Sequence, residues 1–329
     1  MNIIITGGAG FIGSHLADHL GKIKKIKKII VIDNLKDGSK KNLSDALKLS
    51  KVKLFKADIR NIKSISKYFK NIDVVVHLAA MSDIVPSIEE PVDYLETNFN
   101  GTLNILECMK KYNVKKIVYA ASSSCYGIPK RVPTVEKEKI NPMYPYAFSK
   151  YIGEQLINHY STVYKINYLS LRLFNVYGTR SRTNSAYGAA LGVFLKQKLE
   201  NKPFTVVGNG KQKRDFIHVK DVCNAFKKAI FSNIKNEVFN VGFGVPKSVN
   251  ELIKFIGGKK IFIPKRPGEP EITHANIKKI KAKLKWYPKI TLKDGVNDVL
   301  KHINYWKNST LWDKDKIKKA TKNWFKYLK

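Results

Sequence analysis

The chain has 329 residues, with 61 Lys and Arg against 26 Asp and Glu, which gives a formal net charge of +35. Because 43% of its residues are hydrophobic, it can build a large core, and this composition excludes an intrinsically disordered protein. The sequence contains no run of 18 apolar residues, so we expect no membrane span. The strand-like segment directly after Met1 argues against a cleaved signal peptide.

The positive charge comes almost entirely from lysine. Only seven of the 61 basic residues are Arg, which leaves 61 − 7 = 54 Lys spread along the whole chain. A specific nucleic-acid binder relies on Arg for bidentate contacts, so this excess favours a solvated surface over a specific nucleic-acid site. Three widely spaced cysteines form neither a disulfide framework nor a zinc pattern, so we expect a reducing, cytoplasmic location.

Short apolar segments alternate with longer amphipathic stretches in the first half of the chain. The amphipathic stretches cover residues 11–20 and 97–111, and a long helix is expected at 146–164 before a further strand at 168–172. This alternation predicts a Rossmann-type doubly wound α/β fold, in which helices cover both faces of a parallel sheet. The strands are expected to be buried on both faces and to lie at Asn2–Thr6, Ile29–Ile32, Val52–Phe55, Val74–His77 and Ile117–Ala121.

The rhythm changes after residue 176, where glycines, prolines and polar loops separate helices expected at 189–200 and 249–255. We therefore divide the chain into a dinucleotide-binding domain, 1–176, and a smaller C-terminal α/β region, 177–329, that mainly binds substrate. No linker rich in Gly, Pro and Ser separates them, so the two regions are expected to interlock. The aromatic end of the chain (Trp306, Trp312, Trp324, Phe325) packs against either the body or a partner subunit, and packing within the chain is the favoured reading.

A glycine-rich turn follows the first strand and opens the first helix. In the segment Thr6–Gly13, Gly7 permits a tight turn, Gly10 lets the backbone approach a pyrophosphate, and Gly13 lets helix and sheet pack closely. Asp33 ends the second strand twenty residues later, where a carboxylate accepts hydrogen bonds from both ribose hydroxyls. Because an Asp repels a 2′-phosphate, the predicted cofactor is NAD and not NADP.

The spacing G-x-x-G-x-x-G resembles the extended short-chain dehydrogenase/reductase family, and further motifs carry the resemblance over about residues 1–290. They are Ala57-Asp58-Ile59-Arg60, His77-Leu78-Ala79-Ala80 and Asn98-x-x-Gly101-Thr102. In this family Asp58 would bind adenine, and the segment after His77 would lie along the cofactor. The cofactor contacts that the resemblance implies are Gly7, Gly10, Phe11, Ile12, Gly13, Asp33, Asn34, Asp58, Ile59, Leu78, Ala79, Ala80, Asn98, Tyr146 and Lys150.

Tyr146 and Lys150 form a Tyr-x-x-x-Lys pair, which places both side chains on one face of a helix. Positive charge from Lys150 and from an oxidised nicotinamide would lower the pKa of the phenol, so that it can act as a base. By resemblance the catalytic hydroxyl is Ser122, four residues before Tyr126. Dehydratases of this family carry Asp-Glu at the next two positions, and decarboxylases keep the Glu, whereas this chain has Ser123 and Ser124.

The same resemblance assigns a substrate site to the second half of the chain. Asn175 would meet the substrate diphosphate, Arg214 and Arg266 would grip its phosphates, and Glu269 would bond the nucleotide ribose. Thr273 stands where a bulky residue restricts the sugar pocket in hexose 4-epimerases, so its small side chain is compatible with an N-acetylhexosamine. Arg180 and Arg182, in the divergent segment 178–191, either contact substrate or lie on the surface.

These motifs identify the chain as a member of the NAD-dependent nucleotide-sugar epimerase/dehydratase group, nearest to UDP-glucose and UDP-N-acetylglucosamine 4-epimerases. Epimerisation at C4 of a UDP-hexose or UDP-N-acetylhexosamine, through a 4-keto intermediate, is the function this implies. A dehydratase, decarboxylase or reductase on the same fold is the alternative, and a Lys-rich RNA-binding protein a remote one. Relatives pair through helices equivalent to 97–111 and 146–164, so a homodimer is expected; no metal site is expected.

Overall fold

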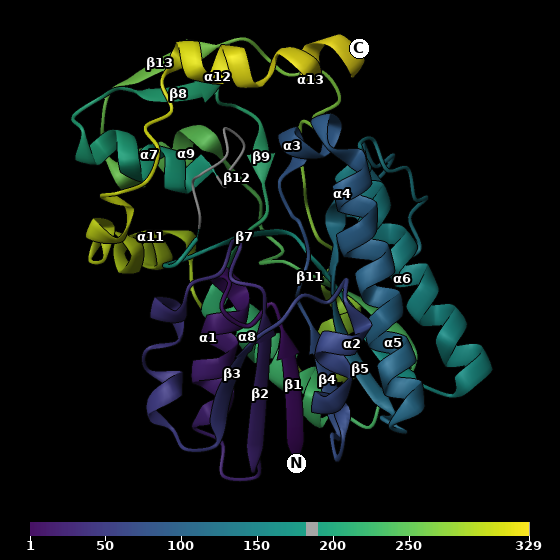
Figure 1. Ribbon diagram of the computed structural model, residues 1–329. Coiled ribbons are helices and arrows are strands. Elements are labelled where there is room, and N and C mark those ends of the chain that lie inside the picture. Colours follow the sequence, from purple (N-terminus) through teal and green to yellow (C-terminus); the bar gives the residue numbers. More distant parts are fainter. Residues whose placement is uncertain (182–189, 329) are drawn as a thin grey trace.

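The computed structural model describes residues 1–181 and 190–328. Within these residues seven strands form one sheet, and every neighbouring pair in it runs parallel (Figure 1). Because β1 lies inside the sheet and the chain winds outward from it in both directions, the predicted doubly wound Rossmann-type fold is confirmed. The strands, in order across the sheet, are β11 (Glu237–Val241), β6 (Asn167–Leu173), β5 (Lys116–Ser122), β4 (Val74–His77), β1 (Asn2–Thr6), β2 (Lys28–Asp33) and β3 (Val52–Lys56).

Alternate side chains of the strands supply two separate cores, one on each face of the sheet. Ile3 and Ile5 of β1 belong to one core, whereas Ile4 belongs to the other. Burial on both faces explains why these strands are apolar along their whole length. The first face is covered by α1 (Phe11–Gly21), α8 (Val219–Phe231) and α10 (Lys278–Leu284), and the second by α2 (Ile62–Ile65), α5 (Gly101–Lys111) and α6 (Pro145–Tyr164).

The predicted strands and helices of the first half are confirmed, with two differences. β3 is one of the two edge strands of the sheet and its Lys53 and Lys56 are exposed, so the expected burial of this strand on both faces is wrong. The helix expected at 97–111 begins with a π-helical turn, η4 (Glu96–Asn100), before α5 continues it. Two short helices, α3 (Ile84–Glu89) and α4 (Pro91–Leu95), precede that turn.

The C-terminal region lies over the carboxyl edge of the sheet and has a core of its own (Figure 1). The chain nevertheless returns to the large sheet, since β11 pairs with β6 and α8 packs against α1. The domain division at residue 176 stays a prediction. The remaining elements are β7 (Asn175–Tyr177), α7 (Ala190–Leu199), β8 (Phe204–Val207), β9 (Lys213–Arg214), β10 (Phe216–His218), β12 (Lys247–Ser248), α9 (Val249–Ile256), β13 (Lys260–Ile263), α11 (Leu292–Leu300), α12 (Lys314–Ala320) and α13 (Lys322–Tyr327).

The tail of the chain packs on this body, as Trp306 and Trp324 are both fully buried. A search of the described residues finds no helix with the length and apolarity needed to cross a membrane.

A buried ion pair joins α6 to the sheet. The Arg172 guanidinium on β6 donates from Nε and Nη2 to the two carboxylate oxygens of Glu154 on α6, and both side chains are almost completely buried. Arg172 Nη1 also donates to the Tyr126 hydroxyl at 2.9 Å and to the Glu136 carbonyl at 3.0 Å. The pair therefore connects the helix that carries Tyr146 and Lys150 to the strand beside it.

We predict that Arg172→Met lowers the free energy of unfolding by about 3–5 kcal/mol, because it leaves the Glu154 carboxylate buried without its partner. The double variant Arg172→Met/Glu154→Leu removes both charges and should recover most of that loss. Urea unfolding of the two variants and the parent tests this. Equal destabilisation of the single and double variants would contradict a role for the buried charge.

Candidate active site

The glycine-rich turn lies directly against the end of β4. Gly7 has a φ of +68°, and a Cβ atom there would lie 2.6 Å from the Ala79 backbone nitrogen. A Cβ atom at Gly13 would lie 2.2 Å from the Gly7 carbonyl oxygen. No side chain caps the N-terminus of α1, and its first turn holds no acidic residue. The turn therefore presents uncapped backbone N–H groups and the positive end of a helix dipole, which suits a pyrophosphate.

A cavity of about 440 Å³ opens over the carboxyl ends of β1, β2, β4 and β5. Nearly all of the predicted cofactor and catalytic residues line it. This is the crevice in which doubly wound sheets bind their ligands. The predicted residues that line it are Gly7, Gly10, Phe11, Ile12, Gly13, Asp33, Asn34, Asp58, Ile59, Leu78, Ala79, Ala80, Ser122, Tyr146 and Lys150.

Two carboxylates mark the end of the cavity at β2 and β3. Asp33 Oδ2 accepts from the Ala9 backbone N–H at 2.9 Å, and Oδ1 accepts from that of Leu35 at 2.8 Å. Since each carboxylate oxygen has a second lone pair, Asp33 keeps capacity for hydroxyl donors. Asp58 accepts from Arg60 and Asn34, and the Arg60 bond lowers the pKa of Asp58 to about 2. A dinucleotide whose adenosine ribose carries no 2′-phosphate fits this end of the cavity.

His77, at the end of β4, is the centre of a buried hydrogen-bond chain. Thr102 Oγ1 donates to the Asn98 carbonyl at 2.6 Å, so it accepts from His77 Nε2–H at 2.9 Å. His77 Nδ1 then accepts from the Thr6 hydroxyl at 2.7 Å. Burial lowers the pKa of His77 from 6.5 to about 3, so the imidazole is neutral at physiological pH.

Asn98 continues this chain behind the wall of the cavity. Its amide accepts from the Met81 N–H at 2.8 Å, and donates to the Met81 carbonyl at 2.9 Å and to Ser149 Oγ at 2.8 Å. Ser149 Oγ in turn donates to the Tyr146 carbonyl at 2.9 Å. The structure thus places Asn98 behind the lining residues, where it positions the Met81 segment and the first turn of α6.

The three predicted catalytic side chains lie together at the carboxyl end of β5: Ser122, Tyr146 and Lys150. Pro145 is the first residue of α6, so Tyr146 and Lys150 lie one helical turn apart near its N-terminus. The Ser122 hydroxyl lies near enough to the Tyr146 phenol to lower its pKa. The Lys150 ammonium lies 4.1 Å from the centre of the Tyr119 ring. The base, the hydroxyl that assists it and the cation predicted from the sequence are therefore brought together.

Burial disfavours the charged forms of both Tyr146 and Lys150. It raises the pKa of Tyr146, while the nearby Ser122 hydroxyl lowers it. Burial also lowers the pKa of Lys150 to about 7, and the Glu154 carboxylate opposes that shift. A cation arriving beside Tyr146 would stabilise the phenolate. Around them, Ser124 Oγ lies 2.7 Å from Ser122 Oγ, and no carboxylate occupies positions 123 or 124.

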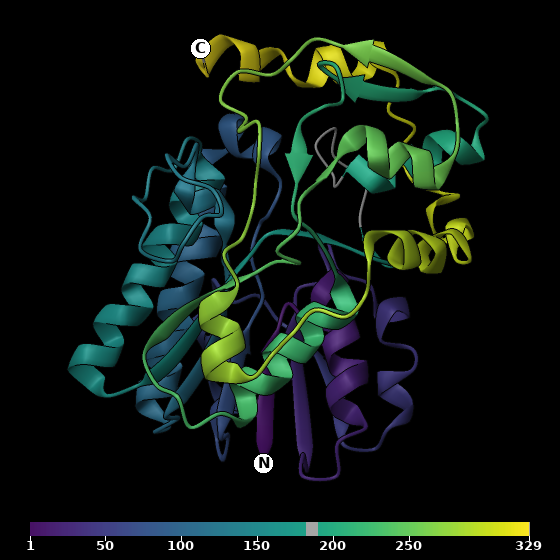
Figure 2. The same cartoon turned by 180° about the vertical axis from the view of Figure 1, so that it is seen from behind.

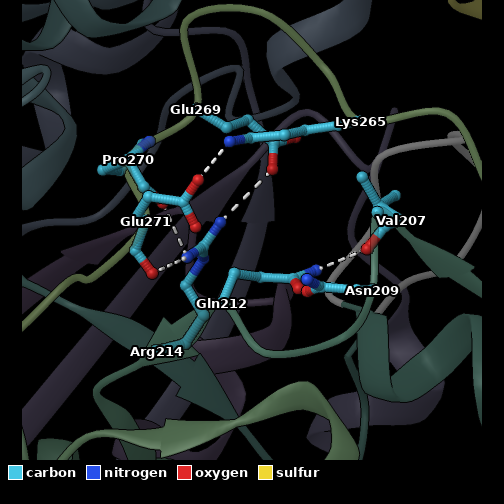
Figure 3. A pocket seen from close by; sticks show the side chains of 9 residues that line it. Val207, Asn209, Gln212, Arg214, Lys265, Glu269, Pro270 and Glu271 are labelled. Carbon is cyan, nitrogen blue, oxygen red and sulfur yellow. Dashed lines mark hydrogen bonds and ion pairs between the residues drawn. The ribbon is translucent and has the colours of Figure 1, made fainter.

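Two of the predicted substrate-binding residues, Arg214 and Glu269, line a second, smaller cavity of about 190 Å³, whereas Arg266 does not line it (Figure 3). Glu269 stands between the two guanidiniums: Oε2 accepts from Arg214 Nη2 at 3.2 Å, and Oε1 accepts from Arg266 Nη1 at 3.3 Å. Across the same cavity Lys265 pairs with Glu271, and Gln212 Nε2 donates to the Val207 carbonyl at 2.9 Å. Two Arg side chains therefore converge on one place, each with N–H groups that suit a diphosphate.

Asn175 and Thr273 contact each other and line neither cavity. Thr273 Oγ1 donates to Asn175 Oδ1 at 2.7 Å and accepts from the Asp215 N–H at 3.1 Å. Arg180 forms an ion pair with Asp18 at 2.7 Å, whereas Arg182 lies outside the described residues. Among the residues described, no group of three or more His, Cys, Asp and Glu side chains could hold a metal ion.

Sequence reasoning missed several residues that line the cavities. Met81, Ser82 and Asp83 line the first one, and they directly follow the predicted cofactor segment that ends at Ala80. Phe174 and Val176, the two neighbours of the predicted Asn175, line it too. Further lining residues belong to no sequence motif, and only the fold places them at a cavity. They are Lys36, Asp37, Gly38, Ser181, Asn209, Gln212, Lys265 and Glu271.

Comparison with known proteins gives a consistent result. The model of the "NAD dependent epimerase/dehydratase family" matches residues 3–242. The resemblance stated from the motifs is thereby confirmed, and NAD, the predicted cofactor, is the one for which this family is named.

Three relatives illustrate the range of named substrates. A Methanocaldococcus jannaschii protein provisionally named as a UDP-glucose 4-epimerase is 40% identical over 315 residues, covering 93% of this chain and 99% of that one. A UDP-glucuronate 4-epimerase of Thermodesulfobacterium geofontis is 32% identical, with 95% and 96% covered. The structure of a UDP-N-acetylglucosamine 4-epimerase from Methanobrevibacter ruminantium M1, in complex with UDP-N-acetylmuramic acid, superposes with a TM-score of 0.85 at 31% identity, covering 92% and 98%.

The neutral His77 predicts a specific loss of stability in acid. Between pH 6.5 and about 3 the unfolded state binds a proton at this residue that the folded state does not. The free energy of unfolding should therefore fall as the pH drops below 6.5, by up to about 1.4 kcal/mol per pH unit from this group alone. His77→Gln keeps an acceptor and a donor but does not titrate, so its profile between pH 6.5 and 5 should be flatter. Chemical unfolding at several pH values checks this, and parallel profiles would show that His77 does not contribute.

Proposed function

Because the chain belongs to the NAD dependent epimerase/dehydratase family, we propose that it interconverts the C4 epimers of a UDP-hexose or a UDP-N-acetylhexosamine. One observation carries the proposal. Tyr146 lines the dinucleotide cavity together with Ser122 and with Lys150, which lies one helical turn away, and no carboxylate occupies the two positions after Ser122.

The first cavity fits the cofactor. The turn at Gly7–Gly13 would hold the pyrophosphate, Asp33 the adenosine ribose, and Lys150 the nicotinamide ribose. When bound, NAD supplies an acceptor for the hydride of the sugar C4 and a donor for its return. The uncapped N-terminus of α1 and the free lone pairs of Asp33 support this assignment.

Tyr146 acts on the C4 hydroxyl of the sugar. Its phenolate takes the hydroxyl proton as the C4–H bond breaks, which leaves a 4-keto sugar. Ser122 donates a hydrogen bond to the same oxygen and relays the proton. After the sugar has turned its opposite face to the cavity, Tyr146 returns the proton to the C4 oxygen, which yields the epimer. No water enters or leaves the substrate in this cycle.

The turn of the sugar requires that the rest of the substrate stays in place. Arg214 and Arg266 would hold the two phosphates, each guanidinium using N–H groups that now face Glu269. Glu269, held between them, is within reach of the nucleotide ribose. The sugar then swings about its phosphate linkage while the nucleotide does not move.

A dehydratase or decarboxylase would need an additional acid or base beside Ser122. Ser123 and Ser124 cannot supply one, and Ser124 Oγ is in hydrogen-bonding distance of Ser122 Oγ. For the sugar itself, the resemblance allows both a plain hexose and an N-acetylhexosamine, because Thr273 is small at the position that it assigns to the sugar pocket.

The protein would act as a homodimer that pairs through α5 and α6. Exposed apolar side chains on α6 support this: Phe148 is 49% exposed and Val163 is 50% exposed. Together with Ile152, Gln155 and His159 they recur at helical spacing along one face. The equivalent face of a partner copy would cover this stripe.

Mass-resolved turnover tests the proposed reaction. Purified protein is incubated without added NADH with UDP-, GDP-, CDP- and dTDP-sugars, including UDP-glucose, UDP-N-acetylglucosamine and UDP-glucuronate. An epimer of unchanged mass from a UDP-hexose or UDP-N-acetylhexosamine is expected. Loss of water or carbon dioxide from the substrate, or turnover of UDP-glucuronate alone, would contradict the proposal.

We further expect Tyr146→Phe to lower kcat by about 10²–10⁴-fold, because it removes the general base while the ring keeps its packing. Tyr164→Phe is the matched control, since this residue lies on the same helix at its exposed end. Steady-state rates and thermal unfolding of both variants provide the measurement. A Tyr146→Phe enzyme with more than a tenth of the parent kcat would remove Tyr146 from its assigned role.

A further inference from the structure

The last segment of the chain crosses from the substrate half to the cofactor half. We define residues 313–328, which contain α12 and α13, as the C-terminal clasp. It begins on the C-terminal core, where the Trp312 carbonyl accepts from Gln197 Nε2 at 2.6 Å. It then passes over the top of the molecule and ends beside α3 (Figures 1 and 2). No motif of the sequence assigned a function to this segment.

Trp324 lies at the point where the two halves meet. It is fully buried, and its indole N–H donates to the Pro267 carbonyl at 2.8 Å. Pro267 follows Arg266 directly, in the loop that carries the proposed phosphate-binding residues. On its other side the indole ring lies 6.0 Å from the ring of Tyr144, and the Tyr144 ring lies parallel to that of Tyr146, with centroids 6.5 Å apart.

A second contact ties the clasp to the cofactor half. Asn323 Nδ2 donates to Glu89 Oε1 at 3.2 Å, at the end of α3. Helix α3 directly follows Asp83, which lines the first cavity. The Tyr94 hydroxyl donates a hydrogen bond to the Asp83 carbonyl at 2.5 Å. The clasp therefore contacts, through adjacent residues, both the phosphate loop and the helix that follows the wall of the cofactor cavity.

We propose that Trp324 is a positioning residue that holds the loop of Arg266–Glu269 at a set distance from Tyr146. The inference rests on the proposed function, in which the diphosphate is gripped by one half and the sugar reacts at the other. Since this loop carries Arg266 and Glu269, a loop that is already ordered before binding spares the substrate the free-energy cost of ordering it, which strengthens the grip on the diphosphate. The indole supplies that order by a buried hydrogen bond and an aromatic contact, and not by touching the substrate.

The chain offers a matched control. Trp286 is 1% exposed, and its indole N–H also donates to a backbone carbonyl, that of Asp221, at 3.1 Å. It packs in the core between α8, α10 and the sheet, away from the phosphate loop. Replacing either Trp by Phe keeps an aromatic ring and removes the same kind of hydrogen bond, so both variants should lose similar stability.

The experiment measures UDP binding by calorimetry, KM and kcat with the best UDP-sugar, NAD content and thermal unfolding for Trp324→Phe, Trp286→Phe and the parent. Trp324→Phe should weaken UDP binding and raise KM about five- to tenfold, because the phosphate loop loses one buried hydrogen bond. Its kcat should change less than its KM, and its NAD content should match the parent. Trp286→Phe should leave UDP affinity and KM unchanged.

Equal UDP affinity and KM in Trp324→Phe and the parent would overturn the inference, as would an equal change in Trp286→Phe. If Trp324→Phe does not fold, Asn323→Ala, which removes the contact with Glu89, takes its place with a KM increase of about two- to fivefold. An unchanged KM in that variant likewise overturns the inference. A parent protein that binds no UDP would instead contradict the proposed function, so the two failures are distinguishable.

Discussion

The hydrogen-bond chain through neutral His77 is the constraint on which the rest of the site depends. It runs from Thr6 at the end of β1, through His77 at the end of β4 and Thr102 at the start of α5, to Asn98 in η4 and on to Ser149 in α6. Every member is buried, so each lost bond would leave a polar group without a partner. One chain of bonds thus aligns the glycine turn, the wall of the cavity and the helix of Tyr146.

The candidate site is shared by two parts of the chain, the sheet with its flanking helices and the C-terminal region that lies over it. The parallel sheet and its two cores hold the first cavity, whereas Arg214 and Arg266, the proposed phosphate ligands, belong to the region above the sheet. The same region sends β11 and α8 back into the layers of the sheet, which limits how far the halves can move apart. A reaction in which one end of the substrate stays fixed while the other end turns over benefits from such a connection.

The Lys and Arg residues of this chain have different roles. The 54 Lys residues are dispersed along the chain. Lys150 is one of the buried ones, and burial lowers its pKa to about 7. Arg214 and Arg266 instead keep an acidic partner between them, which holds both guanidiniums in place. The large positive charge of the chain can attract a dianionic sugar nucleotide, whereas the proposed contacts with its phosphates belong to two Arg side chains.

The sequence by itself determined the strands, the glycine turn and the Tyr146–Lys150 pair, because each depends on local spacing: apolar runs, a turn that needs Gly, and residues four apart on a helix. It could not show that β3 is an edge strand, since burial depends on which strands become neighbours. Only the tertiary structure decided that Asn98 lies behind the cavity wall, that Glu269 stands between two Arg residues, and that Trp324 meets the Arg266 loop. Those contacts join residues up to 57 positions apart in the chain, and no local pattern encodes such a meeting.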